Sequence, residues 1–161
     1  MTADFERAQV YAAEVAAFDG TDLEDVVGFD TVARAITEVL DGDWWPGTAV
    51  AVRAMRADAR SSNARCGDGQ HTTISIAATQ ATIATGAHEL AHALAGVDAG
   101  HGPRYRRAHL DVVSAITNRT RSTGRGDVHV EQLRHAYAAA GLTIGVRDWP
   151  APPAPGSAIA L

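Results

Sequence analysis

The sequence contains no lysine, only one cysteine and no long apolar run. A single cysteine, Cys66, excludes an internal disulfide and a cysteine-based zinc ribbon, and it fits a reducing compartment. No apolar run approaches the roughly 18 residues of a membrane span, and the charged first residues lack the apolar core of a signal peptide. We therefore expect a cytoplasmic protein with no membrane partner.

Charge is also scarce. Charged residues make up 20 % of the 161 residues, the formal net charge is −5 and the pI is about 5.7. Nucleic acid is not an expected partner, because phosphate backbones are bound by basic surfaces. The 46 % hydrophobic content is typical of a globular protein, and the length predicts one domain, which we place at 1–148. The prolines that follow Trp149 predict an extended, flexible tail over 149–161.

One short motif carries chemistry: His88-Glu89-Leu90-Ala91-His92, which has the pattern H-E-x-x-H. On a helix, residues four apart share a face about 6 Å apart, so the two histidines could bind one metal ion. Glu89 lies next to the first histidine, where a carboxylate can take a proton from a water molecule at an open coordination position. The alternative is an ordinary helix that happens to contain two histidines.

A third ligand is needed, and His101 is the first candidate. It follows His92 by nine residues and stands in Gly-His-Gly-Pro, just before the predicted start of a helix at Pro103. Three carboxylates compete with it: Asp98, Asp111 and Glu131. Asp98 or Asp111 could instead orient a ligand histidine from outside the site.

Hydrophobic spacing predicts an α+β fold with a small antiparallel sheet. The expected helices span 3–18, 31–40, 79–95, 103–117 and 128–140. The expected strands span 48–56 and 71–77, joined by a long hairpin loop over 58–70, with a further short strand over 142–146. Thr79 is expected to cap the motif helix and Gly96 to end it. The two N-terminal helices are interpreted as scaffold without chemistry.

Several other conspicuous side chains are expected to have structural roles without chemistry. Trp44 and Trp45 are expected to pack at a core edge, His71 to end a strand, and Cys66 to be an ordinary loop cysteine. Six arginines cluster around 104–125 and are interpreted as a solvated face. The free edge of strand 71–77 is expected to be able to pair with an extended peptide.

The combination of His-Glu-Leu-Ala-His-Ala-Leu at 88–94 with His-Gly-Pro-Arg-Tyr at 101–105 resembles the SprT-like and WLM-like zincin metallopeptidases. It is most similar to small bacterial metallohydrolases that share this short core, over residues 79–113. The resemblance implies a zincin-like single domain whose H-E-x-x-H helix precedes a ligand-bearing loop and helix. It also implies that His88, His92 and His101 bind Zn²⁺ and that Glu89 is the catalytic base. A cysteine-rich DNA-binding module of the kind found in crosslink-repair members is absent from this sequence.

The expected activity is hydrolysis of a peptide bond in a peptide or protein substrate. Tyr105 and His109 are weak candidates for a donor that would stabilise the oxyanion. Two other functions remain open: a zinc-stabilised binding module without catalysis, and a metallohydrolase of another kind, such as an RNA-processing enzyme. The oligomeric state and the substrate do not follow from the sequence.

Overall fold

The computed structural model describes residues 4, 6–67, 70–118 and 126–153. The helices are α1 (Arg7–Phe18), α2 (Phe29–Asp41), α3 (Ile83–Ala95), α4 (Pro103–Asn118) and α5 (Gly126–Ala139). The strands are β1 (Ala49–Ala54), β2 (Asn63–Gly67) and β3 (His71–Ile76). Three short 3-10 helices complete the order: η1 (Asp22–Glu24), η2 (Ala78–Gln80) and η3 (Val97–Ala99). The expected α+β class is therefore confirmed.

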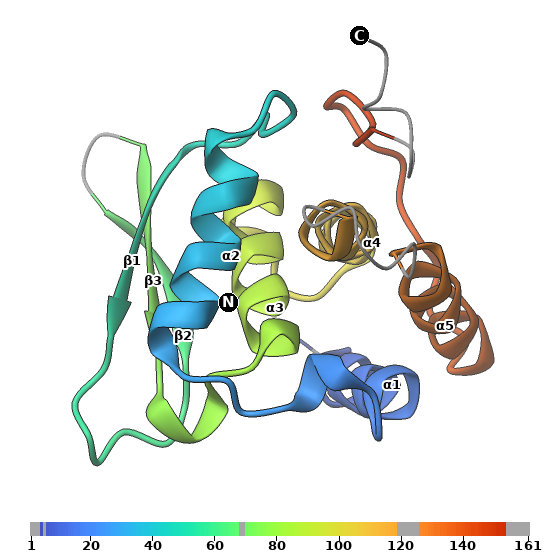
Figure 1. The fold of residues 1–161 in the computed structure, drawn as a ribbon. Helices are drawn as coiled ribbons and strands as arrows, with labels where there is room; N and C mark the ends of the chain where they lie inside the picture. The colour runs from blue at the N-terminus through green and yellow to red at the C-terminus, as the bar shows by residue number, and fades with distance from the viewer. Residues whose placement is uncertain (1–3, 5, 68–69, 119–125, 154–161) are drawn as a thin grey trace, which may run out of the picture.

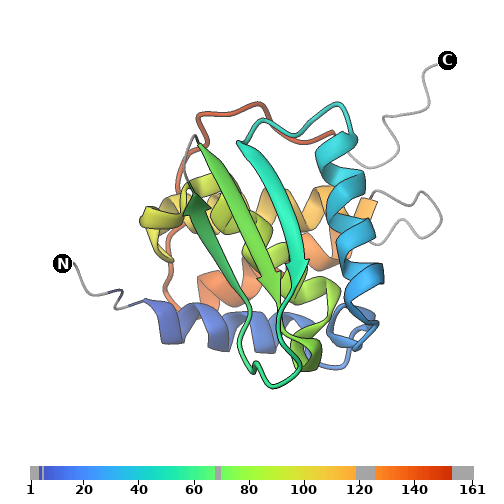
Figure 2. The same cartoon turned by 90° about the vertical axis from the view of Figure 1, so that its left-hand side faces the viewer.

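The sheet lies on one side of the molecule, and the helices form the rest (Figure 1). Figure 2 shows the sheet from its outer face, with the helices behind and beside it. The motif helix α3 contacts β2 and β3 on the sheet side and α4 on the helical side. Helix α5 contacts both α4 and α1. The motif helix thus has neighbours on two sides, and 11 of its 13 residues are buried.

The prediction of an antiparallel sheet is wrong, because the sheet is mixed. Its strand order is β1-β3-β2, with β1 parallel to β3 and β2 antiparallel to it. The expected hairpin loop contains β2, a strand with no hydrophobic alternation that forms by hydrogen bonding to β3. Ser62 fixes its start, since the Ala77 amide donates to Ser62 Oγ over 2.9 Å and the Ser62 amide donates to Gln80 Oε1 over 2.7 Å.

The expectation of a free edge on strand 71–77 is also wrong. β3 is the central strand, paired on both sides, and Ile74 and Ile76 lie in the core. Of the three strands in the described chain, only β1 and β2 have an outer edge. β2 is the edge strand that contacts both α3, which carries the histidine motif, and η3, which lies between that motif and His101.

The N-cap of the motif helix lies three residues later than expected. Residues Ala78–Gln80 form η2, and Thr82 rather than Thr79 caps α3, accepting a hydrogen bond from the Thr85 amide at 3.0 Å. Gly86 packs closely against α2, since a Cβ there would lie 2.8 Å from Val32 Cγ1. Gly96, at φ +94°, follows the helix as expected.

The predicted strand over 142–146 does not form. Residues 142–150 run instead without regular structure along α4, where the Gly145 amide donates to Pro103 O over 3.0 Å. Trp149 is buried and donates to Asp111, and Pro150 O accepts a bond from the Trp44 indole at 2.8 Å. The beginning of the expected tail thus packs on the domain, and residues 154–161 lie outside the described residues.

The three described arginines of the expected cluster bond to this same C-terminal segment. Arg106 donates to Thr143 O and Arg107 to Gly145 O, while Arg104 pairs with Asp148. The expected solvated face is therefore wrong for the buried Arg106, whereas Arg104 is exposed, as expected, and Arg107 is half-buried. The others of the cluster, Arg119, Arg121 and Arg125, lie outside the described residues. No described helix is both long and apolar enough to cross a bilayer.

Candidate metal centre

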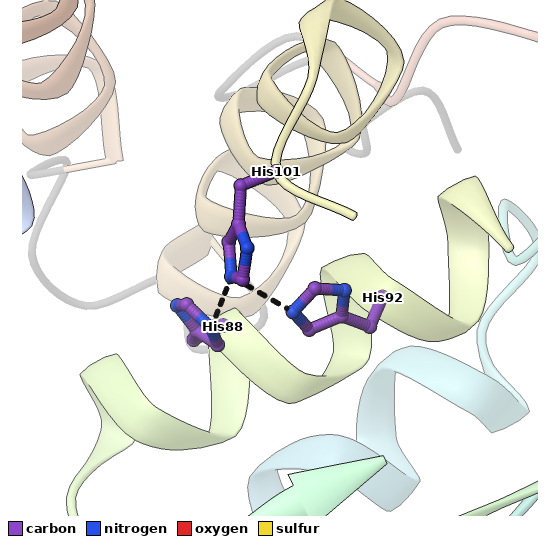
Figure 3. A group of neighbouring side chains, drawn as sticks. All are labelled: His88, His92 and His101. Atoms are coloured by element: carbon purple, nitrogen blue, oxygen red, sulfur yellow. Dashed lines mark hydrogen bonds between the residues drawn. The ribbon is translucent and has the colours of Figure 1, made fainter. Parts of the chain in front are cut away.

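Three histidine side chains converge at one point (Figure 3). His88 and His92 extend from successive turns of α3, and His101 reaches them from the loop before α4. His101 Nε2 lies 3.2 Å from His92 Nε2 and 3.3 Å from His88 Nε2. Tetrahedral zinc, with Zn–N distances of about 2.0–2.1 Å, places its nitrogen ligands roughly 3.3 Å apart. In the described part of the chain, this is the group whose donor atoms could hold a metal ion.

The loop before α4 places His101. Gly100 adopts φ +59° and ψ −139°, a backbone conformation that residues other than glycine rarely adopt. The buried Arg106 guanidinium donates to the His101 carbonyl over 2.9 Å and to Glu6 over 2.7 Å. The position of His101 is therefore fixed through its own backbone as well as its ring.

Carboxylates outside the cluster orient two of the three rings. His88 Nδ1 lies 2.8 Å from Glu14 Oε1, and His101 Nδ1 lies 2.5 Å from Asp4 Oδ2. When Nδ1–H donates to a carboxylate, the Nε2 lone pair is left to face a metal. The His92 Nδ1 is buried and has no hydrogen-bond partner among the described residues.

Sequence reasoning missed the contribution of α1, which it interpreted as scaffold. Asp4 precedes this helix, and Arg7, Tyr11 and Glu14 lie along it at spacings of three, four and three residues, which places them on one face. Tyr11 stacks on the His88 ring at 5.1 Å with an interplanar angle of 11°. The helical spacing of these polar residues was a visible signal, but nothing in the sequence linked it to the motif 74 residues later.

A buried chain of polar groups continues from Glu14 into the core. His109 Nε2 lies 3.2 Å from Glu14 Oε1, and His109 Nδ1 lies 2.6 Å from the Tyr137 hydroxyl. Burial lowers the pKa of His109 to about 4, so the ring is neutral at pH 7. A hydrogen on Nε2 would lie near the Glu14 charge, which favours a tautomer in which Tyr137 donates to Nδ1. Nε2 itself has no hydrogen-bond partner among the described residues.

Burial also shifts the pKa values inside the cluster. It lowers the pKa of His92 to about 2, with the neighbouring histidines adding to the effect. It lowers the pKa of His101 too, against the opposing effect of Asp4. Burial works in the same direction on His88, but the charge and hydrogen bond of Glu14 outweigh it and raise the pKa of His88. Metals bind the unprotonated ring, so His92 and His101 are ready to act as ligands at pH 7.

Glu89 is buried beside His88 with 6 % of its surface exposed. Burial raises the pKa of Glu89 to about 7, while the nearby His88 opposes the shift. A carboxyl group with a pKa close to the working pH can both accept and return a proton. The environment of Glu89 therefore matches the needs of a general base.

The rival third ligands do not join the cluster. Asp98 is exposed on η3, and Glu131 is exposed on α5, where it pairs with Arg134. Asp111 is buried but accepts two hydrogen bonds from Arg147 and one from Trp149, each over 2.8 Å. Neither Asp98 nor Asp111 is the carboxylate that orients a histidine, since Asp4 and Glu14 have that position.

The remaining candidates have ordinary environments. Tyr105 is fully buried, and its hydroxyl lies 3.4 Å from the His88 carbonyl. Trp44 and Trp45 pack against the core edge, as expected. Cys66 is exposed on β2 rather than in a loop, and His71 is exposed at the start of β3.

Comparison with known proteins adds no relative: no family model, no curated protein and no solved structure matches this chain. The resemblance to SprT-like and WLM-like zincins therefore stays a prediction that rests on the motif residues. The function must be inferred from the three histidines and the groups that surround them.

Proposed function

We propose that this protein is a zinc-dependent metallohydrolase, and specifically a metallopeptidase that cleaves peptide bonds. One observation carries the proposal: three imidazole Nε2 atoms converge, with the buried Glu89 carboxyl group beside the first of them. Catalytic zinc sites characteristically combine three protein ligands with an open position and a nearby carboxylate. The arrangement supports hydrolysis better than electron transfer or simple storage of an ion.

The ligand set fits zinc. Imidazole nitrogen suits zinc, copper, iron and nickel, and the spacing of the three Nε2 atoms suits tetrahedral coordination. His88, His92 and His101 would hold the ion, and Glu14 and Asp4 would keep two of the rings in the ligating tautomer. Bound zinc would polarise the substrate carbonyl and bring the pKa of a water molecule to about 7.

Glu89 would act as the base. Its carboxylate would accept the proton of the attacking water and then deliver it to the amine that leaves when the peptide bond breaks. The Glu89 pKa of about 7 suits both the uptake of the proton and its release. Burial also keeps competing water away from the carboxylate, which strengthens its interaction with developing charge.

The resemblance to zincins favours a peptide or protein substrate, because H-E-x-x-H most often serves proteolysis. A role on DNA is not proposed, since the net charge is −5 and the sequence has no cysteine-rich module. The edge strand β2 lies against the motif helix and could pair with an extended peptide.

A second function is favoured by one specific observation. His88, His101 and Glu89 are each at most 6 % exposed, which also suits a zinc ion that stabilises a binding module without catalysis. Digestion of a denatured casein and a random peptide library separates the two functions. Cleavage supports the hydrolase, whereas a zinc-loaded protein that cleaves nothing supports the binding module.

The substitution Glu89→Gln tests the base directly. It should leave zinc stoichiometry unchanged and lower kcat by at least about 100-fold, because a carboxamide cannot accept the proton. The measurement is peptide cleavage by protein with verified zinc content, with the surface substitution Glu131→Gln as the matched control. Cleavage at the wild-type rate by zinc-loaded Glu89→Gln would remove Glu89 from the mechanism.

A further inference from the structure

Tyr11 lies over the exposed side of the histidine cluster. Its ring stacks on His88 at 5.1 Å and tilts over His101 at 5.4 Å. Tyr11 is 40 % exposed, whereas Tyr105, whose ring approaches all three ligand rings within 5.4 Å, is completely buried. Tyr105 therefore packs against the cluster from the core side, and a substrate approaching from solvent would contact Tyr11.

The other two tyrosine hydroxyls are already engaged. Tyr105 lies in hydrogen-bond range of the His88 carbonyl, and Tyr137 donates to His109. His109, the other expected oxyanion donor, is fully buried, and its Nδ1 is hydrogen-bonded to Tyr137. Neither expected donor can therefore reach a substrate without breaking a bond in the core.

Tyr11 has a different neighbour, Arg7, one turn earlier on α1. The Arg7 guanidinium carbon lies 5.6 Å from the centre of the Tyr11 ring. Burial raises the pKa of Tyr11, and the nearby positive charge of Arg7 opposes that shift.

We propose that Tyr11 is a catalytic residue whose hydroxyl donates a hydrogen bond to the substrate carbonyl oxygen as that oxygen gains negative charge. This inference rests on the proposed hydrolase function and assigns one step of it to α1. A pre-placed donor stabilises the transition state because its orientation is already fixed before the reaction. Stacking on His88 supplies that fixed orientation, and the nearby Arg7 charge favours an anionic oxygen.

The substitution Tyr11→Phe separates the hydroxyl from the ring. Phenylalanine can keep the stacking on His88 but cannot donate a hydrogen bond. Methylphosphonate serves as the probe, since its tetrahedral oxyanion resembles the state to be stabilised. Binding is followed by the visible absorption of cobalt(II)-substituted protein, which needs no substrate, and cobalt affinity is measured first by chelator competition. Val15→Ala, an exposed position one turn later on α1, is the matched control.

Tyr11→Phe should bind cobalt within about twofold of wild type and methylphosphonate roughly tenfold more weakly, as expected for a lost bond to a charged group. Val15→Ala should change neither value. Equal methylphosphonate affinity in wild type and Tyr11→Phe would overturn the proposal, as would wild-type protein that fails to bind methylphosphonate. A loss of cobalt affinity in Tyr11→Phe would also overturn it, because the hydroxyl would then support the ligands instead.

The failure of this inference can be told apart from the failure of the proposed function. A tenfold loss of methylphosphonate binding without any peptide cleavage by wild type would keep the Tyr11 donor and remove the peptidase. Peptide cleavage that Tyr11→Phe leaves unchanged would keep the peptidase and remove the donor. If cleavage is found, Tyr11→Phe should lower kcat about tenfold with KM within twofold, because the bond strengthens only in the transition state.

Discussion

Helices α3 and α1 contribute to the same centre in different ways. α3 supplies two ligands and the proposed base within five consecutive residues. α1 supplies Glu14, and the segment before α1 supplies Asp4; these two carboxylates orient the rings of His88 and His101. The ligands are visible as a motif, and the groups that orient them are visible only once the chain is folded. A short motif therefore specifies the donor atoms, whereas carboxylates that are distant in the sequence fix the orientation of the histidine rings.

The largest expected effect within this comparison comes from Glu14. Glu14→Ala should weaken zinc binding by about 10–100-fold, because His88 loses its hydrogen-bond acceptor and a buried His109 N–H loses its charged neighbour. Zinc affinity is measured by competition with a chelator, and Glu14→Gln is the matched variant that keeps an acceptor oxygen. Wild-type zinc affinity in folded Glu14→Ala would reduce α1 to scaffold, as the sequence alone suggested.

Asp4 should matter less. Its side chain is 32 % exposed, so water can replace part of its interaction with His101. Asp4→Asn should weaken zinc binding by up to about tenfold, measured in the same chelator competition. A larger loss than that of Glu14→Ala would reverse the proposed order of the two carboxylates.

Asp111 lies outside the metal centre and should affect stability instead of zinc binding. Asp111→Asn should leave zinc affinity unchanged but lower the free energy of unfolding by about 1–3 kcal/mol, since Arg147 loses a buried charged partner. Urea unfolding of metal-free protein gives the stability, and chelator competition gives the affinity. Weakened zinc binding together with unchanged stability would return Asp111 to the list of ligands.

The parts of the fold that sequence could predict are those with local signals. The helices at 103–117 and 128–140 match α4 and α5 within two residues at each end, because their apolar spacing is regular. β2 could not be predicted, since Asn63–Gly67 has no apolar alternation and forms only beside β3. The segment 142–150 was equally hidden, because its partners lie on α4, some 40 residues earlier.

The same contrast between local and long-range signals explains which parts of the candidate metal centre could be predicted. His88, His92 and His101 fall within fourteen residues, so local helix geometry and one loop bring them together. The Glu14 contact to His88 spans 74 residues and the Asp4 contact to His101 spans 97. No local pattern encodes contacts of that range, which depend on α1 docking against the helices that follow the sheet.

Elemental analysis of purified wild-type and His101→Ala protein tests whether the three histidines hold one zinc ion. We predict about one zinc per wild-type chain and a loss of most of that zinc in His101→Ala after equal dialysis, with Asp98→Ala retaining it. Zinc retained tightly by His101→Ala, or no zinc in wild type even after reconstitution, would contradict the account.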